Sequence, residues 1–375
     1  DEEIAEVVDT LKSDWITTGP KVRQFEKDFV SFLGAGAALA TSSATDAMQV
    51  GLAALGLGRG DEVITTPMTF CSTAHVIEHM GAKPVFVDVR RDTLNINPER
   101  IVEAITPDTK VILPVHLYGH PCDMDAILDI ADGHDLYVLE DAAHALPAEY
   151  QGRSVGTLGD LTAFSFYATK NLTTGEGGML TGSSSLIEEA RVWSMHGMSR
   201  DAWKRYTSKG SWYYEVLKPG FKSNMMDIQA AIGIHQLKKL RGFQERRKEI
   251  VSRYHRAFRD IEEIDIPEAH AEVEPAWHLY VIRLNPGQLA IDRDQFIEEL
   301  KRRNIGSSVH FIPVHMHPYY RDRYSYQPED FPVAFQEYHR IISLPLNLRM
   351  TDEDVSDVIW AVKDVVSQFK RQVSR

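Results

Sequence analysis

Residues 164–178 read FSFYATKNLTTGEGG, so Lys170 follows an apolar and aromatic run and precedes several glycines. Lysine side chains rarely leave water, because burial strips the ammonium group of its hydration. In an apolar setting the pKa of the amine falls, and a neutral amine can attack the carbon of an aldehyde. The glycines let the backbone pass close to a bulky group. The segment therefore predicts a reactive lysine beside a ligand.

Two other segments carry groups that would complete a site for pyridoxal phosphate. Asp141 ends the apolar run LYVLED, and a carboxylate there can hold a protonated ring nitrogen or simply cap the next turn. Ser42, Ser43 and Thr45 precede an alanine-rich helical segment, whose free N–H groups suit a phosphate, although plain N-capping is the commoner use of such serines. A lysine for the aldehyde, a carboxylate for the ring and donors for the phosphate are what this cofactor needs.

The elements that must position these groups alternate between strands and helices in the first two-thirds of the chain. Short apolar runs separated by helix-length connections indicate βαβ units and a mostly parallel sheet covered on both faces. The reactive lysine falls between the last two of these runs. The predicted strands are 61–66, 83–88, 110–119, 136–142, 161–168 and 177–182.

A long helical segment from about residue 223 is expected to leave this sheet and lead to a smaller α+β unit. The predicted architecture is a large α/β domain over residues 1–240 and a small C-terminal domain over 241–375. The segments assigned to the smaller unit are 276–284, 292–304, 307–311 and a final amphipathic helix at 352–371.

Composition excludes several classes of protein. The net charge of -13 over 375 residues argues against nucleic-acid binding, which usually needs a basic face. No apolar run is long enough for a spanning helix, and two cysteines cannot form a disulfide framework. We therefore expect a cytoplasmic protein whose partners are small molecules, with neither nucleic acid nor membrane among them.

Several stretches in order along the chain resemble the DegT family of sugar aminotransferases. They include ITTGPKVRQFEKDF, TSSATDAM, EDAAHALPAEYQGRSVG, FSFYATKN, GEGGML and MDIQAAIGIHQL. The resemblance implies a fold-type-I pyridoxal-phosphate enzyme with a large α/β domain, a small C-terminal domain, and homodimers that share their active sites.

The resemblance also implies a role for individual residues. Lys170 corresponds to the lysine that forms the internal aldimine with pyridoxal 5'-phosphate and shuttles protons, and Asp141 to the partner of the ring nitrogen. Ser165 and Thr45 correspond to the hydroxyls that hold the phosphate, together with the backbone of Ala44. The family usually has glycine at the position of Ala44.

Other positions are expected to surround the cofactor ring and its phosphate. Phe70 and His144 correspond to the residues on the two sides of the ring. Much of the family has Asn-x-Arg before the long helix, where this chain has Lys222 and Asn224. Asn224 is the residue expected to reach the phosphate of the neighbouring subunit; from the local pattern alone, these two residues could equally cap the helix.

Lys170 also favours transamination over sugar dehydration, since family members that dehydrate sugars carry histidine at its position. SDWITTGPK, KNLTTGEGG and EVLKPGFKSN look most like the bacterial UDP-4-amino-4-deoxy-L-arabinose–oxoglutarate aminotransferases. This implies amino transfer from L-glutamate to the C4 ketone of a UDP-4-keto-pentose or an NDP-4-keto-6-deoxyhexose, as in the lipid A modification of lipopolysaccharide. A homologue that binds cofactor and nucleotide sugar without turnover, as a regulator, is the alternative.

The sequence gives fewer indications of which residues bind the sugar substrate. Thr18, His310 and His315 are expected there, and the aromatic segment 201–220 is a candidate lid. Three imidazoles can bind zinc, but the prolines among His310, His315 and His317 do not favour a metal spacing. No metal site is therefore predicted.

Overall fold

A sheet of seven strands lies at the centre of the larger part of the molecule, in a computed structural model that describes residues 1–199 and 213–371. Neighbouring strands β8, β5, β4, β2 and β3 run parallel, whereas β9 lies antiparallel to both β8 and β1. This confirms the predicted α/β fold with a mostly parallel sheet. In sheet order the strands are β1 (Ala37–Thr41), β9 (Gly178–Gly182), β8 (Leu161–Ser165), β5 (Tyr137–Asp141), β4 (Thr109–Ile112), β2 (Glu62–Thr65) and β3 (Lys83–Phe86).

Successive residues of the central strands belong to two different apolar clusters. Val63, Val111 and Leu139 pack in one cluster with residues of α3 (Ala44–Ala54). Their neighbours Ile64, Ile112 and Val138 pack in another cluster with residues of α5 (Pro98–Ala104) and α6 (Met124–His134). Because side chains alternate along a strand, both faces of the sheet are buried. The helices α4 (Ser72–His79) and α7 (Ser184–Ser194) contact α3.

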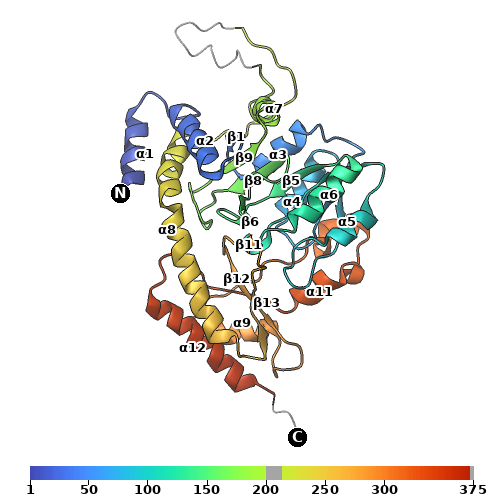
Figure 1. Cartoon of the computed structure of the whole chain (residues 1–375), viewed down its shortest axis with the longest axis vertical. Helices are drawn as coiled ribbons and strands as arrows, with labels where there is room; N and C mark the ends of the chain where they lie inside the picture. Colours follow the sequence, from blue (N-terminus) through green and yellow to red (C-terminus); the bar gives the residue numbers. More distant parts are fainter. Residues whose placement is uncertain (200–212, 372–375) are drawn as a thin grey trace.

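The helix α8 (Asp227–Phe258) connects the two parts of the chain, as Figure 1 shows. Its first half packs with α1 (Glu2–Lys12) and α2 (Pro20–Leu33), and its second half contributes to the core of the C-terminal part. The predicted domain boundary at residues 240 and 241 falls within this unbroken helix. The division into domains stays a prediction.

A second sheet of three antiparallel strands forms the C-terminal part, with α9 (Arg293–Arg302) and α12 (Asp352–Phe369) packed against it. The segment 307–311 forms no strand and contributes only a bridge between Ser308 and Ser343. The strands are β10 (Ile264–Asp265), β12 (Tyr280–Leu284) and β13 (Ile341–Leu344), and the short helices α10 (Pro318–Tyr324) and α11 (Pro332–Tyr338) precede β13 in the chain.

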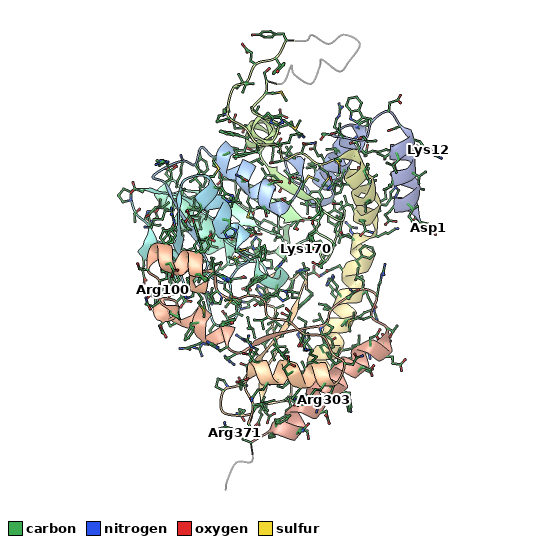
Figure 2. All side chains as sticks on the ribbon, turned by 180° about the vertical axis from the view of Figure 1, so that it is seen from behind. Asp1, Lys12, Arg100, Lys170, Arg303 and Arg371 are labelled. Carbon is green, nitrogen blue, oxygen red and sulfur yellow. The ribbon has the colours of Figure 1, made fainter. Side chains whose placement is uncertain are left out.

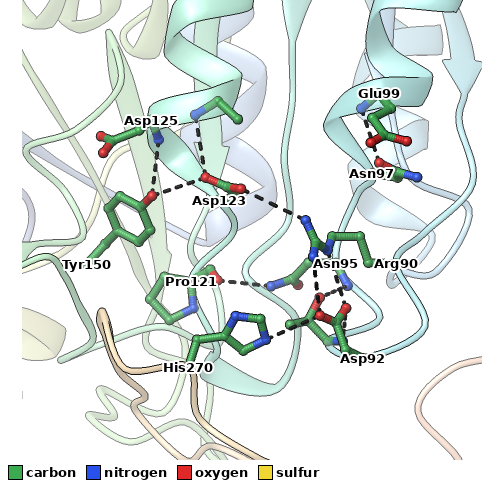
Figure 3. Close-up of polar contacts among 12 residues, drawn as sticks. Arg90, Asp92, Asn95, Asn97, Glu99, Pro121, Asp123, Asp125, Tyr150 and His270 are labelled. Carbon is green, nitrogen blue, oxygen red and sulfur yellow. Dashed lines mark hydrogen bonds and ion pairs between the residues drawn. The ribbon is translucent and has the colours of Figure 1, made fainter.

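The segment that leads into β12 is held against the larger part of the molecule. It forms β11 (Val273–Glu274), which pairs with β6 (Glu149–Tyr150), itself paired with β7 (Arg153–Ser154). A polar network adds to this contact, in which Nε2 of His270 lies 3.3 Å from a carboxylate oxygen of Asp92 (Figure 3). The chain is thus fixed just before it reaches the candidate site. In the part of the chain that the structure describes, no helix combines the length and apolarity needed to cross a membrane.

Candidate active site

The carboxyl ends of two neighbouring parallel strands bring the predicted reactive groups together. Asp141 is the last residue of β5, and Ser165 is the last residue of β8. Lys170 follows in a turn after β8, where its backbone N–H donates to the carbonyl of Tyr167 at 2.9 Å. Figure 2 shows Lys170 near the middle of the molecule. Ligands of open α/β sheets bind beyond these strand ends.

A cavity of about 440 Å³ lies at this place, within the size range of sites for small ligands. Most of the residues predicted for the site line it. They are Ala44, Thr45, Phe70, Asp141, His144, Ser165, Lys170 and His310.

Burial changes the proton affinity of the two central groups. It lowers the pKa of Lys170 to about 8, and the nearby charge of Asp141 only partly opposes this effect. Burial also raises the pKa of Asp141, although N–H of Ala143 and the hydroxyl of Thr73 donate to its carboxylate at 3.1 and 2.8 Å. A buried carboxylate of this kind is stabilised by a cationic partner. The pair therefore suits a ligand with a carbonyl carbon and a protonated nitrogen.

The start of α3 forms one end of the cavity. Ser43 caps this helix by accepting from N–H of Asp46 at 3.1 Å. Among the described residues, no hydrogen bond uses the N–H groups of Ala44 or Thr45. These free donors and the hydroxyl of Thr45 suit an anion.

Gly178 lets β9 pass next to this helix start. A Cβ atom there would lie 2.4 Å from the carbonyl carbon of Ser43 and 2.6 Å from the nitrogen of Ala44. No other residue type fits that contact without moving the helix start. Glycine is therefore required at position 178 for steric reasons. The sequence pattern indicated only that the backbone passes close to another group.

Aromatic rings form the walls between these groups. Phe70 is exposed, at 57% of its surface, and its ring centre lies 5.9 Å from that of Phe311. Phe311 stacks at the same distance on His144, with an interplanar angle of 19°. Burial holds the pKa of His144 well below its ordinary value. A flat ligand would meet apolar rings and a neutral imidazole.

Three residues predicted for the site lie outside this cavity. Asn224 donates to the hydroxyl of Thr18 at 2.7 Å and accepts from Lys222. The hydroxyl of Thr18 in turn donates to the carbonyl of Met225 at 2.6 Å. His315 is buried with Nε2 3.1 Å from the carbonyl of Pro328. None of the three lines the cavity, although Asn224 forms a backbone bridge with Thr41, just before α3.

Several lining residues were not predicted, notably His278, Phe311, Tyr167 and Glu176. His278 lies in the segment 276–284, which was assigned from the sequence to the smaller unit without any site residue being predicted in it. Phe311 lies between two predicted positions, but a single phenylalanine carries no chemical signal of its own. These residues come to the cavity through tertiary packing.

Within residues 1–199 and 213–371, no group of three or more His, Cys, Asp or Glu side chains is arranged to hold a metal ion. His310, the histidine of the C-terminal cluster that lines the cavity, pairs through Nδ1 with the hydroxyl of Ser343 at 2.8 Å. The candidate lid at 201–220 lies outside the described residues over its first part, 201–212.

An amine of lowered pKa, a buried carboxylate and free N–H donors around one cavity define an α/β protein equipped for pyridoxal phosphate. The donor set fits this group, because each of its reactive parts meets a complementary group of the chain. Nδ1 of His144, buried and without a hydrogen-bond partner among the described residues, also suits a polar contact with a ligand.

Comparison with known proteins extends this conclusion. The DegT/DnrJ/EryC1/StrS aminotransferase family matches residues 1–363. The uncharacterized protein MJ1066 of Methanocaldococcus jannaschii is 55% identical over 369 residues, covering 98% of this chain and 96% of that protein. The spore coat polysaccharide biosynthesis protein SpsC of Bacillus subtilis is 54% identical over 367 residues, covering 97% and 94%.

Solved structures agree with these relatives. The PMP form of Spr1654 from Streptococcus pneumoniae, described as a sugar aminotransferase, has a TM-score of 0.92 at 35% identity and covers 98% of this chain and 97% of that chain. Its PLP form has a TM-score of 0.91. The chain belongs to the DegT/DnrJ/EryC1/StrS aminotransferase family, so it is a transferase, and pyridoxal phosphate is the cofactor of this family. The family resemblance is confirmed, whereas the closer resemblance to the arabinose branch stays a prediction.

Proposed function

We propose that this chain binds pyridoxal phosphate and transfers an amino group from L-glutamate to the C4 ketone of a nucleotide-linked sugar. The observation that carries the proposal is the cavity in which Lys170, with a pKa lowered to about 8, lies close enough to Asp141 for the carboxylate to affect that pKa. A partly neutral lysine is available near physiological pH, whereas an exposed lysine is almost fully protonated.

Different residues of the chain would bind the phosphate and the ring of the cofactor. The N–H groups of Ala44 and Thr45 and the hydroxyls of Thr45 and Ser165 would hold the phosphate. Asp141 would keep the ring nitrogen protonated, with its orientation fixed by Ala143 and the hydroxyl of Thr73.

The residues around the ring divide the work of catalysis. Pyridoxal phosphate, when bound, supplies an aldehyde carbon and a ring that accepts the electrons left when the substrate loses a proton. Lys170 would provide the amine that holds that aldehyde carbon until the amino group of glutamate displaces it. The freed amine would then take the proton from the α-carbon of glutamate and deliver it to the carbon that had been the aldehyde. The same lysine would move the proton in the reverse direction when the keto sugar receives the amino group. Phe70 and His144 would flank the ring and keep water away from it.

The sugar substrate is proposed from the family branch that the sequence resembles. We propose a UDP-4-keto-pentose or an NDP-4-keto-6-deoxyhexose, used in the cytoplasm for a modified polysaccharide or lipid A. Two relatives support a sugar acceptor, since SpsC is a spore coat polysaccharide biosynthesis protein and Spr1654 is described as a sugar aminotransferase. His310 lines the cavity and is the proposed contact to the sugar. Thr18 stays a proposed contact at the outside of the cavity, whereas His315 is fully buried and could affect the sugar only through other residues.

Spectroscopy on the purified protein tests this proposal in two halves. The protein with bound cofactor should show a visible absorption band, which L-glutamate removes because the amino group moves to the cofactor. UDP- or dTDP-linked 4-keto sugars should then restore the band, and the corresponding 4-hydroxy sugars serve as controls. Loss of the band without restoration by any 4-keto sugar contradicts the proposed acceptor, and no loss with glutamate contradicts the proposed donor.

We also propose a homodimer in which the partner copy completes the phosphate site. Asn224, the residue expected at that site, lies outside the cavity of its own chain and holds Thr18 and Lys222 instead. This position leaves Asn224 available to contact a phosphate in the cavity of the partner copy.

A further inference from the structure

Asn171 and His278 form a buried polar contact directly behind Lys170. Asn171 is the next residue after Lys170, and only 5% of its surface is exposed. Its Nδ2 donates to the carbonyl of Ala276 at 2.8 Å, and its Oδ1 lies 3.1 Å from Nδ1 of His278. His278 is exposed at 7% of its surface and lines the cavity.

This arrangement fixes which ring nitrogen of His278 carries hydrogen. The carbonyl of Ala276 can only accept, so the nitrogen of the Asn171 amide must face it and the oxygen must face His278. Since that oxygen also only accepts, Nδ1 of His278 is the donor. Burial, together with the neighbouring His144 and Lys170, holds the pKa of His278 well below its ordinary value. The ring is therefore neutral, and its Nε2 carries a lone pair.

The backbone around His278 is anchored independently of Asn171. Its N–H donates to the carbonyl of Tyr118 at 3.0 Å. On the other side, the guanidinium of Arg247 on α8 donates to the carbonyls of Trp277 and His278 at 3.1 and 3.3 Å. The imidazole is thus a fixed point to which the turn of Lys170 is tied.

The same ring also contacts His144, another residue that lines the cavity. The ring centres of His278 and His144 lie 4.4 Å apart, with an interplanar angle of 33°. His278 therefore touches the residue proposed to flank the cofactor and is hydrogen-bonded to Asn171, the residue next to Lys170. Simple filling of the core would not require the hydrogen bond to Asn171.

We propose that Asn171 and His278 are positioning residues, whose mutual hydrogen bond fixes the turn from which the Lys170 amine reaches the reacting carbon. The inference rests on the proposed function, in which Lys170 provides that amine. An error of about 1 Å in the position of a reacting group can slow a reaction roughly hundredfold. The contact therefore affects the rate of proton transfer more than the binding of glutamate.

Two substitutions of His278 separate this role from packing. His278→Asn places an amide nitrogen near the position of Nδ1 and retains the donor to Asn171, whereas His278→Gln places its amide near Nε2 and loses that donor. The single-turnover loss of the visible band with glutamate should be roughly hundredfold slower for His278→Gln and within about fivefold of the wild-type rate for His278→Asn. The half-saturating glutamate concentration should stay within about threefold in both.

Matched substitutions and a second readout control for damage to the fold. His120 is also a mostly buried histidine that pairs through Nδ1 with a carbonyl, of Pro121 at 2.8 Å, but it lies outside the cavity. His120→Asn and His120→Gln should react like the wild type. In the cofactor-free protein, nitrogen NMR of labelled histidine should show His278 neutral with hydrogen on Nδ1, and Asn171→Ala should change this signal.

The outcomes distinguish this inference from the proposed function. Equal rates for the two His278 variants, a faster rate for His278→Gln, or an NMR signal with hydrogen on Nε2 would overturn the positioning role. Absence of a visible band in the wild-type protein would instead overturn the role of Lys170. If neither His278 variant folds, the NMR measurement on the wild-type protein and Asn171→Ala decides.

Discussion

At the scale of single residues, the site works because two ionisable groups share a poorly hydrated space. Burial lowers the pKa of Lys170 to about 8 and raises the pKa of Asp141. Both changes disfavour charge in the cavity, as expected where water is excluded. A ligand with a cationic ring nitrogen would stabilise the charged form of Asp141. Such perturbed groups in a cavity are typical of functional sites.

Residue chemistry made part of this site predictable. Lys170 and Asp141 stand out because a lysine and a carboxylate at the ends of apolar runs need an explanation. His278 gives no comparable signal, since its role follows from the contact with Asn171, 107 residues away in the chain. The contact of Asn224 with Thr18 was also beyond sequence reasoning, because it depends on how the start of α8 packs.

At the scale of elements, the site depends on the close packing of β9 against the start of α3. The strands β5 and β8 end at the same edge of the sheet, while Gly178 opens β9 directly against Ser43. The proposed phosphate donors are thus held by backbone packing as well as by the helix cap.

Substitution of Gly178 by alanine tests this packing contact. The new Cβ would press on the backbone at 2.4 Å, so we expect a loss of about 1–3 kcal/mol in the free energy of unfolding. Affinity for pyridoxal phosphate should fall as well. Urea unfolding of the cofactor-free protein measures the first effect, and cofactor titration measures the second.

Gly242 provides the matched control. It lies within α8, and among the described residues a Cβ atom there would meet no heavy atom of another element within 4 Å. Gly242→Ala should therefore stabilise the protein by about 0.5–1 kcal/mol, because alanine favours helix. Equal stability of Gly178→Ala and wild type would show that the contact at the helix start is unimportant.

The elements themselves were predictable to different degrees. Strongly apolar runs predicted the parallel strands, because burial on both faces leaves a clear pattern. The helix α8 was predicted from apolar residues at helical spacing. The strand β13 (Ile341–Leu344) was missed, and the expected strand at 110–119 ends at Ile112. Whether a short segment such as β13 forms a strand depends more on pairing with its neighbour, here β12, than on the β-propensity of its own residues.

At the scale of the whole molecule, α8 joins the two parts, and the segment just before it presents Asn224 outside the cavity of its own chain. If two copies share their sites, defects in different copies can complement one another. Lys170→Ala and Asn224→Asp should each abolish or strongly reduce activity alone. Coexpressed, they should form mixed dimers with one intact site and recover up to about a quarter of the wild-type activity.

A second pair of variants controls this experiment. Lys170 and Asp141 line the same cavity of one chain, so Lys170→Ala and Asp141→Asn should not complement each other. Absence of recovery with Asn224→Asp, or a fully active monomer in sedimentation, would contradict the shared site.

The central claim is that Lys170 supplies the reacting amine, and chemical trapping tests it most directly. Cofactor-free protein would be incubated with pyridoxal phosphate over a range of pH, reduced with borohydride and digested for mass spectrometry. The amine is protonated below its pKa and neutral above it, so labelling of the peptide that contains Lys170 should rise with pH through about 8. Labelling of a different lysine, or labelling that persists in Lys170→Ala, would contradict the account.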